Sequence, residues 1–360
     1  MEELIKILRE KIQSQSRNQE SWAMAILDQQ IKIRKMFHIQ RDSDPFTPYY
    51  PPDSKLSPIY PEVYSETGDR MRFFFLRDKD VPHVPYYACE RFIIWDRFNY
   101  GLENHFYTSD EIFKPIGNPK HKFGILMEPR PIKNQMYDEL FKRKEWIEKE
   151  FDLIFTFDSE VLEKFSNARF VPICAKYWLI GHMGNFSDEE PIIPPDIYKR
   201  KSKMISMIAS RKNACELHRF RQNLAWKCKN EKLADTFGGF DGGRWFKIAE
   251  PFLDYRYSIA VENDISPVFF TEKIMHCFAA QTVPIYLGAT DIGKFFNMDG
   301  IIQFRVEDFD RFDEILKQCT IEDYQRRLPA ILDNFERVKK FKNPFDFMFE
   351  KYLKDFFRDE

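Results

Sequence analysis

The 360-residue sequence lacks any apolar run close to the roughly 20 residues that a membrane-spanning helix needs. It also lacks the apolar core of a signal peptide at its start. The first residues, MEELIKILREKIQ, have instead the pattern of a charged amphipathic helix. From these two absences we expect a cytoplasmic protein.

The chain has no strong excess of charge, because 55 Lys and Arg residues face 57 Asp and Glu residues, for a net charge of −2. This balance argues against a nucleic-acid partner. No C-x-x-C pair is present either, and the six cysteines are scattered at positions 89, 174, 215, 228, 277 and 319. Such spacing indicates reduced, buried thiols and not a disulfide framework or a zinc site.

Apolar residues make up 43% of the chain, enough for sizeable cores, and the 37 phenylalanines predict aromatic packing. The length allows about two domains. Strand and helix patterns alternate from residue 71 to residue 172, which predicts one Rossmann-like α/β domain. We expect that domain, with an N-terminal helical region, over residues 1–190. A second domain would cover residues 191–335 after the Pro-rich linker at 188–195, and a C-terminal helix at 336–360 would pack back on the body.

Residues 255–288, YRYSIAVENDISPVFFTEKIMHCFAAQTVPIYLG, are the most informative stretch. They predict a buried strand, a Pro-containing loop, a helix with Thr271 as its N-cap, and a second buried strand closed by Gly288. This is a βαβ unit with parallel strands and a right-handed crossover. Glu262 and Asn263 then lie where the first strand ends, the edge of a sheet at which ligands bind in α/β proteins.

A strand that ends in Glu-Asn or a capped helix, taken alone, is more often an ordinary solvent-exposed part of a fold than a ligand site. A lysine is a poor choice beside the positive end of a helix dipole, however, and Lys273 falls in the first turn of the predicted helix. It makes more sense if it shares an anion, such as a phosphate, with the backbone N–H groups. The combination therefore predicts a site for an anionic ligand.

Three short motifs of this stretch, Tyr-x-Tyr-Ser-x-x-x-Glu-Asn, Thr-Glu-Lys and Val-Pro-Ile-Tyr-Leu-Gly, resemble the core signature of the α-1,3/α-1,4-fucosyltransferases, glycosyltransferase family 10. The resemblance is strongest over residues 202–304 and thinner over 123–172. It implies the GT-B architecture, an α/β fold of two Rossmann-like domains with a cleft between them. It also implies GDP-L-fucose as the donor, a sugar hydroxyl of a glycan as the acceptor, and inversion at the anomeric carbon.

The resemblance further implies which residues bind the donor. Lys273 and an arginine of the helix predicted at residues 215–228 would neutralise the diphosphate, with help from the N–H groups after Thr271. Two candidates are present, and we favour Arg219 over Arg221. Glu272 would accept hydrogen bonds from the ribose, while Glu262 and Asn263 would hold the nucleotide or the sugar. Phe269 stands where relatives often have Tyr, so a hydrogen bond from that hydroxyl is absent.

Glu128 follows the strand predicted at residues 123–127 and precedes Pro129 and Pro131, which stop the strand. A carboxylate at this edge of a sheet is placed to act as a general base, although a single Glu after a strand is usually a solvated surface residue. In the resembled family, a Glu at this position is the catalytic base. The resemblance therefore implies that Glu128 removes the proton of the acceptor hydroxyl.

Other patterns carry less information. The triplet Asp42-Ser43-Asp44 matches the D-x-D that many glycosyltransferases use with a metal, but it lies in a predicted loop, so we expect no metal site and no obligatory cofactor. Residues 96–109 mix aromatic and polar side chains without a clear period. They fit an acceptor-sugar site and irregular packing equally well. The Phe-rich end of the chain fits packing on the core better than peripheral contact with a membrane.

Animal members of the family are Golgi proteins with a membrane anchor, and the missing anchor resembles the bacterial, cytoplasmic branch, with peripheral contact at the inner membrane left open. An α-1,3 linkage to lipopolysaccharide or another surface glycan would follow. Two alternatives remain: a transferase for another GDP-deoxysugar, and a nucleotide- or glycan-binding module without activity. The oligomeric state is not predicted.

Overall fold

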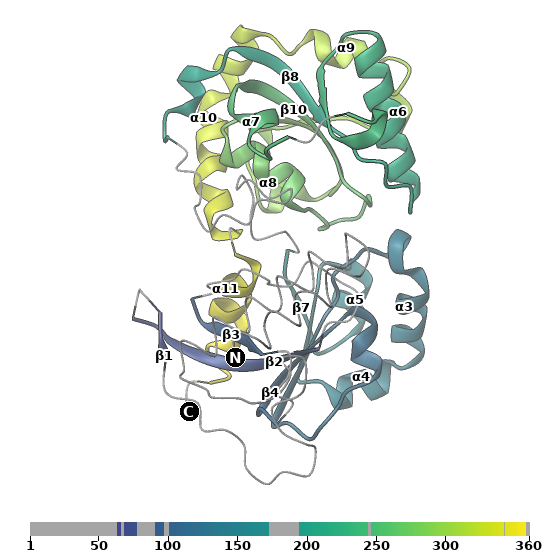
Figure 1. Ribbon diagram of the computed structural model, residues 1–360, viewed down its shortest axis with the longest axis vertical. Helices are drawn as coiled ribbons and strands as arrows, with labels where there is room; N and C mark the ends of the chain where they lie inside the picture. The colour runs from purple at the N-terminus through teal and green to yellow at the C-terminus, as the bar shows by residue number, and fades with distance from the viewer. Residues whose placement is uncertain are drawn as a thin grey trace, which may run out of the picture.

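The computed structural model describes residues 63–65, 68–77, 91–96, 101–172, 194–243, 246–341 and 343–357. The helices predicted within residues 1–38, the Asp42-Ser43-Asp44 triplet, residues 188–193 of the predicted linker, and Cys89 and Cys174 lie outside these ranges. The described chain forms two α/β units that follow one another along the long axis of the molecule (Figure 1).

The first unit is built on a seven-stranded sheet in the order β1-β2-β4-β5-β6-β7, with β3 also paired to β2. All pairs are parallel except that of β1 with β2. The strands are β1 (Val63–Tyr64), β2 (Arg70–Arg77), β3 (Ile93–Asp96), β4 (Asn104–Thr108), β5 (His121–Ile125), β6 (Leu153–Thr156) and β7 (Ala168–Phe170). The helices are α3 (Arg130–Lys142), α4 (Lys144–Glu150) and α5 (Ser159–Lys164).

The second unit is built on a five-stranded parallel sheet in the order β12-β11-β10-β8-β9. Its strands are β8 (Lys203–Ile208), β9 (Asp235–Phe237), β10 (Tyr255–Val261), β11 (Val283–Leu287) and β12 (Ile302–Gln303). Its helices are α6 (Glu216–Asn230), α7 (Glu250–Leu253), α8 (Glu272–Ala279), α9 (Phe312–Lys317) and α10 (Ile321–Val338). The chain starts at β8, adds β9 on one side and returns to add β10 on the other, so the strand order reverses between β8 and β10.

The predicted fold class, two α/β units with parallel sheets, is confirmed, and so is the βαβ unit of β10, α8 and β11. Two local predictions were wrong. Residues 104–108 form the central strand β4, whose last four residues are buried, so this part of the segment is core and not irregular packing. The charged sequence of residues 137–149 predicts a single helix, but the structure has two, because the chain leaves helical geometry at Arg143, and the first begins at Arg130.

The C-terminal segment joins the two units. After α10 the chain continues through α11 (Pro344–Met348) and a π-helical turn (Phe349–Leu353), which lie with the first unit (Figure 1). Their aromatic and apolar side chains belong to the same core as β2, β4 and β5. Packing on the core is therefore the role of this stripe. No helix in the described part of the chain combines the length and apolarity that crossing a membrane requires.

Phe349→Ala tests this packing. The Phe349 ring stacks on Phe92, with 4.7 Å between the centroids, and the side chain is 5% exposed. Truncation should lower the free energy of unfolding by about 3–5 kcal/mol, measured by chemical denaturation. Phe356→Ala, at a ring that is 37% exposed, is the control and should cost clearly less. Equal losses would contradict this account of the segment.

The ends of β10 and β11 approach each other closely at Gly288. A Cβ atom there would lie 2.4 Å from Tyr286 Oη and 2.5 Å from Glu262 Cγ. Gly288→Ala should therefore destabilise the second unit by about 1–3 kcal/mol, seen as a lower Tm in thermal unfolding. Gly239→Ala is the control, because no atom lies within 4 Å of its added Cβ. A Gly288→Ala protein as stable as this control would show that the two strand ends separate easily.

Candidate functional site

The reversal of strand order between β8 and β10 places two loops side by side at the carboxyl edge of the second sheet. One loop leads from β8 to α6, and the other leads from β10 to α8. Ligands of open α/β sheets bind at such a switch point, where two helix N-termini point toward the same space. The predicted residues 219, 221, 262, 263, 271, 272 and 273 all belong to these two loops and helix starts.

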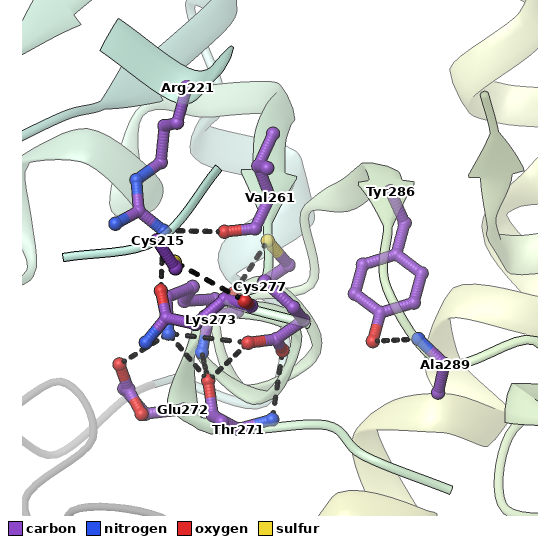
Figure 2. Close-up of polar contacts among 11 residues, drawn as sticks. Cys215, Arg221, Val261, Thr271, Glu272, Lys273, Cys277, Tyr286 and Ala289 are labelled. Atoms are coloured by element: carbon purple, nitrogen blue, oxygen red, sulfur yellow. Dashed lines mark hydrogen bonds and ion pairs between the residues drawn. The ribbon is translucent and has the colours of Figure 1, made fainter. Parts of the chain in front are cut away.

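Glu262 is held in place by several contacts at the carboxyl edge of the second sheet. It follows β10 directly and is fully buried. Its Oε1 accepts a hydrogen bond from the Thr271 backbone N–H at 2.8 Å, and its Oε2 accepts one from the Thr271 hydroxyl at 2.7 Å (Figure 2). Lys273 Nζ lies 3.2 Å from the same Oε2. The carboxylate thus ties the strand end to the first turn of α8.

Thr271 is the N-cap of α8, as predicted, and its hydroxyl accepts from the Lys273 backbone N–H at 3.4 Å. Lys273 Nζ donates to this hydroxyl at 2.8 Å and to Glu272 Oε1 at 3.2 Å. All three donors of the ammonium group therefore have an oxygen partner in the protein. The two carboxylates differ in access, since Glu272 is 31% exposed and Glu262 is fully buried.

The ionisation of this group follows from its contacts. Burial would lower the pKa of Lys273, but Glu262 and Glu272 outweigh burial and raise it above its usual value. Burial would likewise raise the pKa of Glu272, yet Lys273 and His276 lower it to about 2. The ammonium and the Glu272 carboxylate are therefore both charged at neutral pH.

The structure brings Arg221, and not the favoured Arg219, into this cluster. Arg221 is 7% exposed, and its Nη1 donates to Val261 O at 2.7 Å and to Asn263 Oδ1 at 3.2 Å (Figure 2). Arg219 is exposed and donates to Asn213 O at 3.4 Å. The sequence contained a signal for this difference. Position 221 shares the helix face of the buried Leu217, Leu224, Ala225 and Cys228, whereas position 219 does not.

Asn263 connects the two loops. Besides accepting from Arg221, its backbone carbonyl accepts from the Cys215 thiol at 3.4 Å, and its side chain forms a hydrogen bond with His218. His218 is 2% exposed and lies on the first turn of α6. The helix periodicity that places Arg221 on the buried face also places His218 there, because the two residues are three positions apart.

Phe269 does not line the space around Lys273. It is 2% exposed and belongs to the core of the first unit, where its ring lies 4.7 Å from that of Phe157. The loop between β10 and α8 is therefore held against the loop between β6 and α5. The missing hydroxyl at position 269 leaves an apolar contact between the two units.

Glu128 lies between β5 and α3, at the carboxyl edge of the first sheet, and is partly buried. Tyr137 Oη donates to its backbone carbonyl at 3.0 Å. Arg130, two residues further on, makes a two-point ion pair with Asp158 at 2.5 and 2.8 Å and lies over the Tyr137 ring. These contacts fix the segment that bears Glu128 against the N-terminus of α5.

Asp264, in the β10–α8 loop, interacts electrostatically with Asp158 and Arg130. Burial raises its pKa above the usual value, and the nearby Asp158 carboxylate adds to the rise. The pKa of the buried Tyr137 is raised by burial and by Asp158 and Asp264. The charge of Asp264 acts on Tyr137, which donates to Glu128 O, so the loop that follows Glu262 and Asn263 lies within electrostatic range of the Glu128 segment. The sequence motifs did not identify Tyr137, Arg130 or Asp264.

Within the described ranges no three His, Cys, Asp or Glu side chains gather as a metal-binding group. A surface hollow of about 420 Å³ is lined by residues such as Met204, Lys232 and Asp235. It lies by the first residues of β8 and β9, at the edge of the sheet opposite Glu262. The hollow is therefore separate from the cluster around Lys273.

Comparison with known proteins agrees with the motifs. The family described as glycosyltransferase family 10 (fucosyltransferase), C-terminal part, matches residues 198–329. An α-(1,3)-fucosyltransferase of Helicobacter pylori is 34% identical over 62 residues, which cover 17% of this chain and only 13% of that protein.

Solved structures show weaker likeness. An α1,3-fucosyltransferase crystallised with GDP is 14% identical, with a TM-score of 0.46, and the match covers 75% of this chain and 89% of that one. A sucrose-phosphate synthase of Thermosynechococcus elongatus is 9% identical, with a TM-score of 0.46, covering 73% and 75%. The assignment depends on the sequence matches. By these, residues 198–329, which make up most of the second unit, are similar to the C-terminal part of glycosyltransferase family 10, the fucosyltransferases.

Proposed function

We propose that the protein is an inverting glycosyltransferase that moves L-fucose from GDP-L-fucose to a hydroxyl group of a glycan. The observation that carries the proposal is the arrangement of Glu262, Thr271 and Lys273 at the switch point of a domain that matches the fucosyltransferase family model. The Glu128 segment of the first unit lies close to the loop between these residues. Donor binding and chemistry would thus be divided between the two units.

On the donor side, the diphosphate would bind at Lys273 and at the N-terminus of α8. Lys273 has no spare donor, so a phosphate oxygen has to replace one of its three partners. Glu272 is the partner that can leave, because it is 31% exposed while Glu262 is buried and bonded to Thr271. Once displaced, the Glu272 carboxylate is available to the ribose hydroxyls.

The arginines would act differently from one another. Arg221 is buried and spends its hydrogen bonds on Val261 and Asn263, so it would hold the end of β10 and orient the Asn263 side chain toward nucleotide or sugar. Arg219 is exposed at the start of α6 and would meet the diphosphate from solvent. Charge that develops on the leaving GDP is then stabilised by Lys273, by Arg219 and by backbone N–H groups.

On the acceptor side, Glu128 would remove the proton of the attacking hydroxyl. A general base has to be held rigidly within hydrogen-bond reach of that proton. The Tyr137 hydrogen bond to Glu128 O and the Arg130–Asp158 ion pair supply the rigidity. Direct attack of the acceptor oxygen on the anomeric carbon, with GDP leaving from the opposite face, gives inversion.

The finer points are also part of the proposal. We expect an α-1,3 linkage, by analogy with the Helicobacter pylori protein, and a surface glycan such as lipopolysaccharide as the acceptor. The cysteines at positions 215, 228, 277 and 319 are free and buried, in keeping with a reducing compartment such as the cytoplasm. Peripheral contact with the inner membrane would bring the enzyme to lipid-linked acceptors. A transferase for another GDP-deoxysugar is the principal alternative, because residues that would bind GDP say little about which sugar ring the site accepts.

Glu128→Gln tests the base. The amide keeps the size of the side chain but cannot take up the proton, so the transfer rate should fall by about 10²- to 10⁴-fold. Affinity for GDP-L-fucose should stay the same, because the donor binds to the other unit. Transfer is measured in single turnovers against a panel of oligosaccharide acceptors, and donor binding is measured by calorimetry.

Glu139→Gln is the matched control, since Glu139 lies on α3, is 34% exposed and pairs with the exposed Arg143. It should leave both quantities unchanged. A fully active Glu128→Gln enzyme would exclude Glu128 as the base. If the wild-type protein bound GDP-L-fucose but neither transferred nor slowly hydrolysed it, the chain would be a binding module.

Lys273→Met tests the donor site. Affinity for GDP-L-fucose should fall by about 10- to 100-fold, the loss expected for one charge-assisted hydrogen bond to a phosphate. Stability should fall as well, by about 3–5 kcal/mol, because the buried Glu262 loses its cation.

The double variant Glu262→Gln/Lys273→Met separates these two effects. Removing both charges should recover much of the stability but none of the affinity, as measured by denaturation and calorimetry on the same protein. Lys294→Met, at an exposed lysine that pairs with Asp291, is the control and should change neither. Recovery of donor affinity in the double variant would show that Lys273 does not contact the donor.

A further inference from the structure

His218 is a buried side chain for which the proposed mechanism has no use. It is 2% exposed, and its Nδ1 has no hydrogen-bond partner among the residues that the structure describes. Its other polar contact is the hydrogen bond with the Asn263 side chain. Leaving a buried polar atom unpaired costs about 1–3 kcal/mol, so native proteins rarely do it without a reason.

The position of His218 indicates the reason. It lies in the first turn of the 15-residue helix α6, beside the switch point between β8 and β10. Three cations face it from three elements: Arg221 on its own helix, Lys212 in the loop after β8, and Lys273 on α8. An unpaired imidazole nitrogen and several cations around a helix N-terminus are the components of an anion site.

The charge balance of the residues around Lys273 also favours a role for His218 in binding an anion. The buried Arg221 and the partly buried Lys273 are balanced by two carboxylates, Glu262 and Glu272, so they bring no net positive charge to a diphosphate. The further charges of Lys212 and Arg219 are exposed and therefore screened by solvent. A protonated His218 would add a buried positive charge at the site.

We infer that His218 is a donor-binding residue that gives a hydrogen bond through Nδ1 to an oxygen of the diphosphate, and that the imidazole takes up a proton when the donor binds. The inference depends on the proposed function in one respect, the identity of the ligand as a GDP-sugar. The contact itself requires only an anionic oxygen at the N-terminus of α6.

Donor binding and protonation of His218 should favour each other. In the free protein, burial and the charges of Arg221, Lys212 and Lys273 lower the pKa of His218 to about 4, so the ring is neutral at pH 7. A bound anion offsets the three cations and raises this pKa. Donor affinity should therefore increase as the pH falls through the pKa of the bound state and level off below about 4.

Nuclear magnetic resonance of ¹³C-histidine-labelled full-length protein tests the coupling directly. The chain has seven histidines, and the resonance of His218 is the one missing from the spectrum of His218→Gln. In the free protein this resonance should titrate near pH 4, and with saturating GDP-L-fucose it should titrate at a higher pH. An unchanged titration would mean that Nδ1 merely binds an ordered water, and would overturn the inference.

Calorimetry between pH 5 and 8 supplies the second readout. GDP-L-fucose is suitable because its diphosphate, esterified at both ends, does not titrate in this range. Its affinity should rise by up to about tenfold per pH unit, the limit for uptake of one proton, and His218→Gln should remove this dependence. His121→Gln, at a histidine of the first unit that lies 3.4 Å from Asp152, is the control and should keep it. Equal pH dependence in His218→Gln and wild type would also overturn the inference.

Sulfate separates this inference from the proposed function. If sulfate raises the pKa of His218 but GDP-L-fucose does not bind, the anion site stands and the proposed donor is wrong. If GDP-L-fucose is bound and transferred while His218 titrates as in the free protein, the proposed function stands and the role of His218 is wrong. If neither ligand changes the titration, the inference fails whatever the transferase assay shows.

Discussion

The carboxylate of Glu262 is the interaction on which the donor site depends. A fully buried charge is stable only when it is paired and hydrogen-bonded, and here the Thr271 N–H, the Thr271 hydroxyl and the Lys273 ammonium supply those contacts. These requirements fix the end of β10 against the start of α8. They also explain Gly288, because any side chain there would collide with Glu262.

A second set of contacts connects this site to the first unit. Phe269 continues the loop after Glu262 into the core around Phe157, and Asp158 follows Phe157 and binds Arg130. Arg130 in turn belongs to the segment of Glu128. The proposed base and the proposed donor-binding loop are therefore linked through packed side chains and one ion pair. Because packed elements shift as units, closure of one loop would move the other.

The sequence was sufficient for the βαβ unit because its strand patterns, its proline-containing loop and the Thr271 cap all predict the same structure. It was insufficient for β4, whose residues Asn104–Thr108 combine His, Phe and Tyr without the alternation or the aliphatic run of a typical strand. The motif alone did not show that Arg219 and Arg221 differ in burial, because it gives positions along the chain and not the face of the helix. The helix periodicity of α6, which depends on packing, places position 221 on the buried face.

What neither motif nor periodicity could supply is the difference between the two carboxylates at Lys273. Two glutamates beside the same ammonium group differ because Glu262 is bonded to Thr271 and sealed from water, while Glu272 is partly open to solvent. Glu262 keeps the Lys273 ammonium in place when no ligand is bound. In the proposed mechanism, Glu272 is exchanged for a phosphate oxygen. The proposed site is thus preorganised yet carries no unpaired charge, which lets the fold hold a partly buried lysine without a ligand.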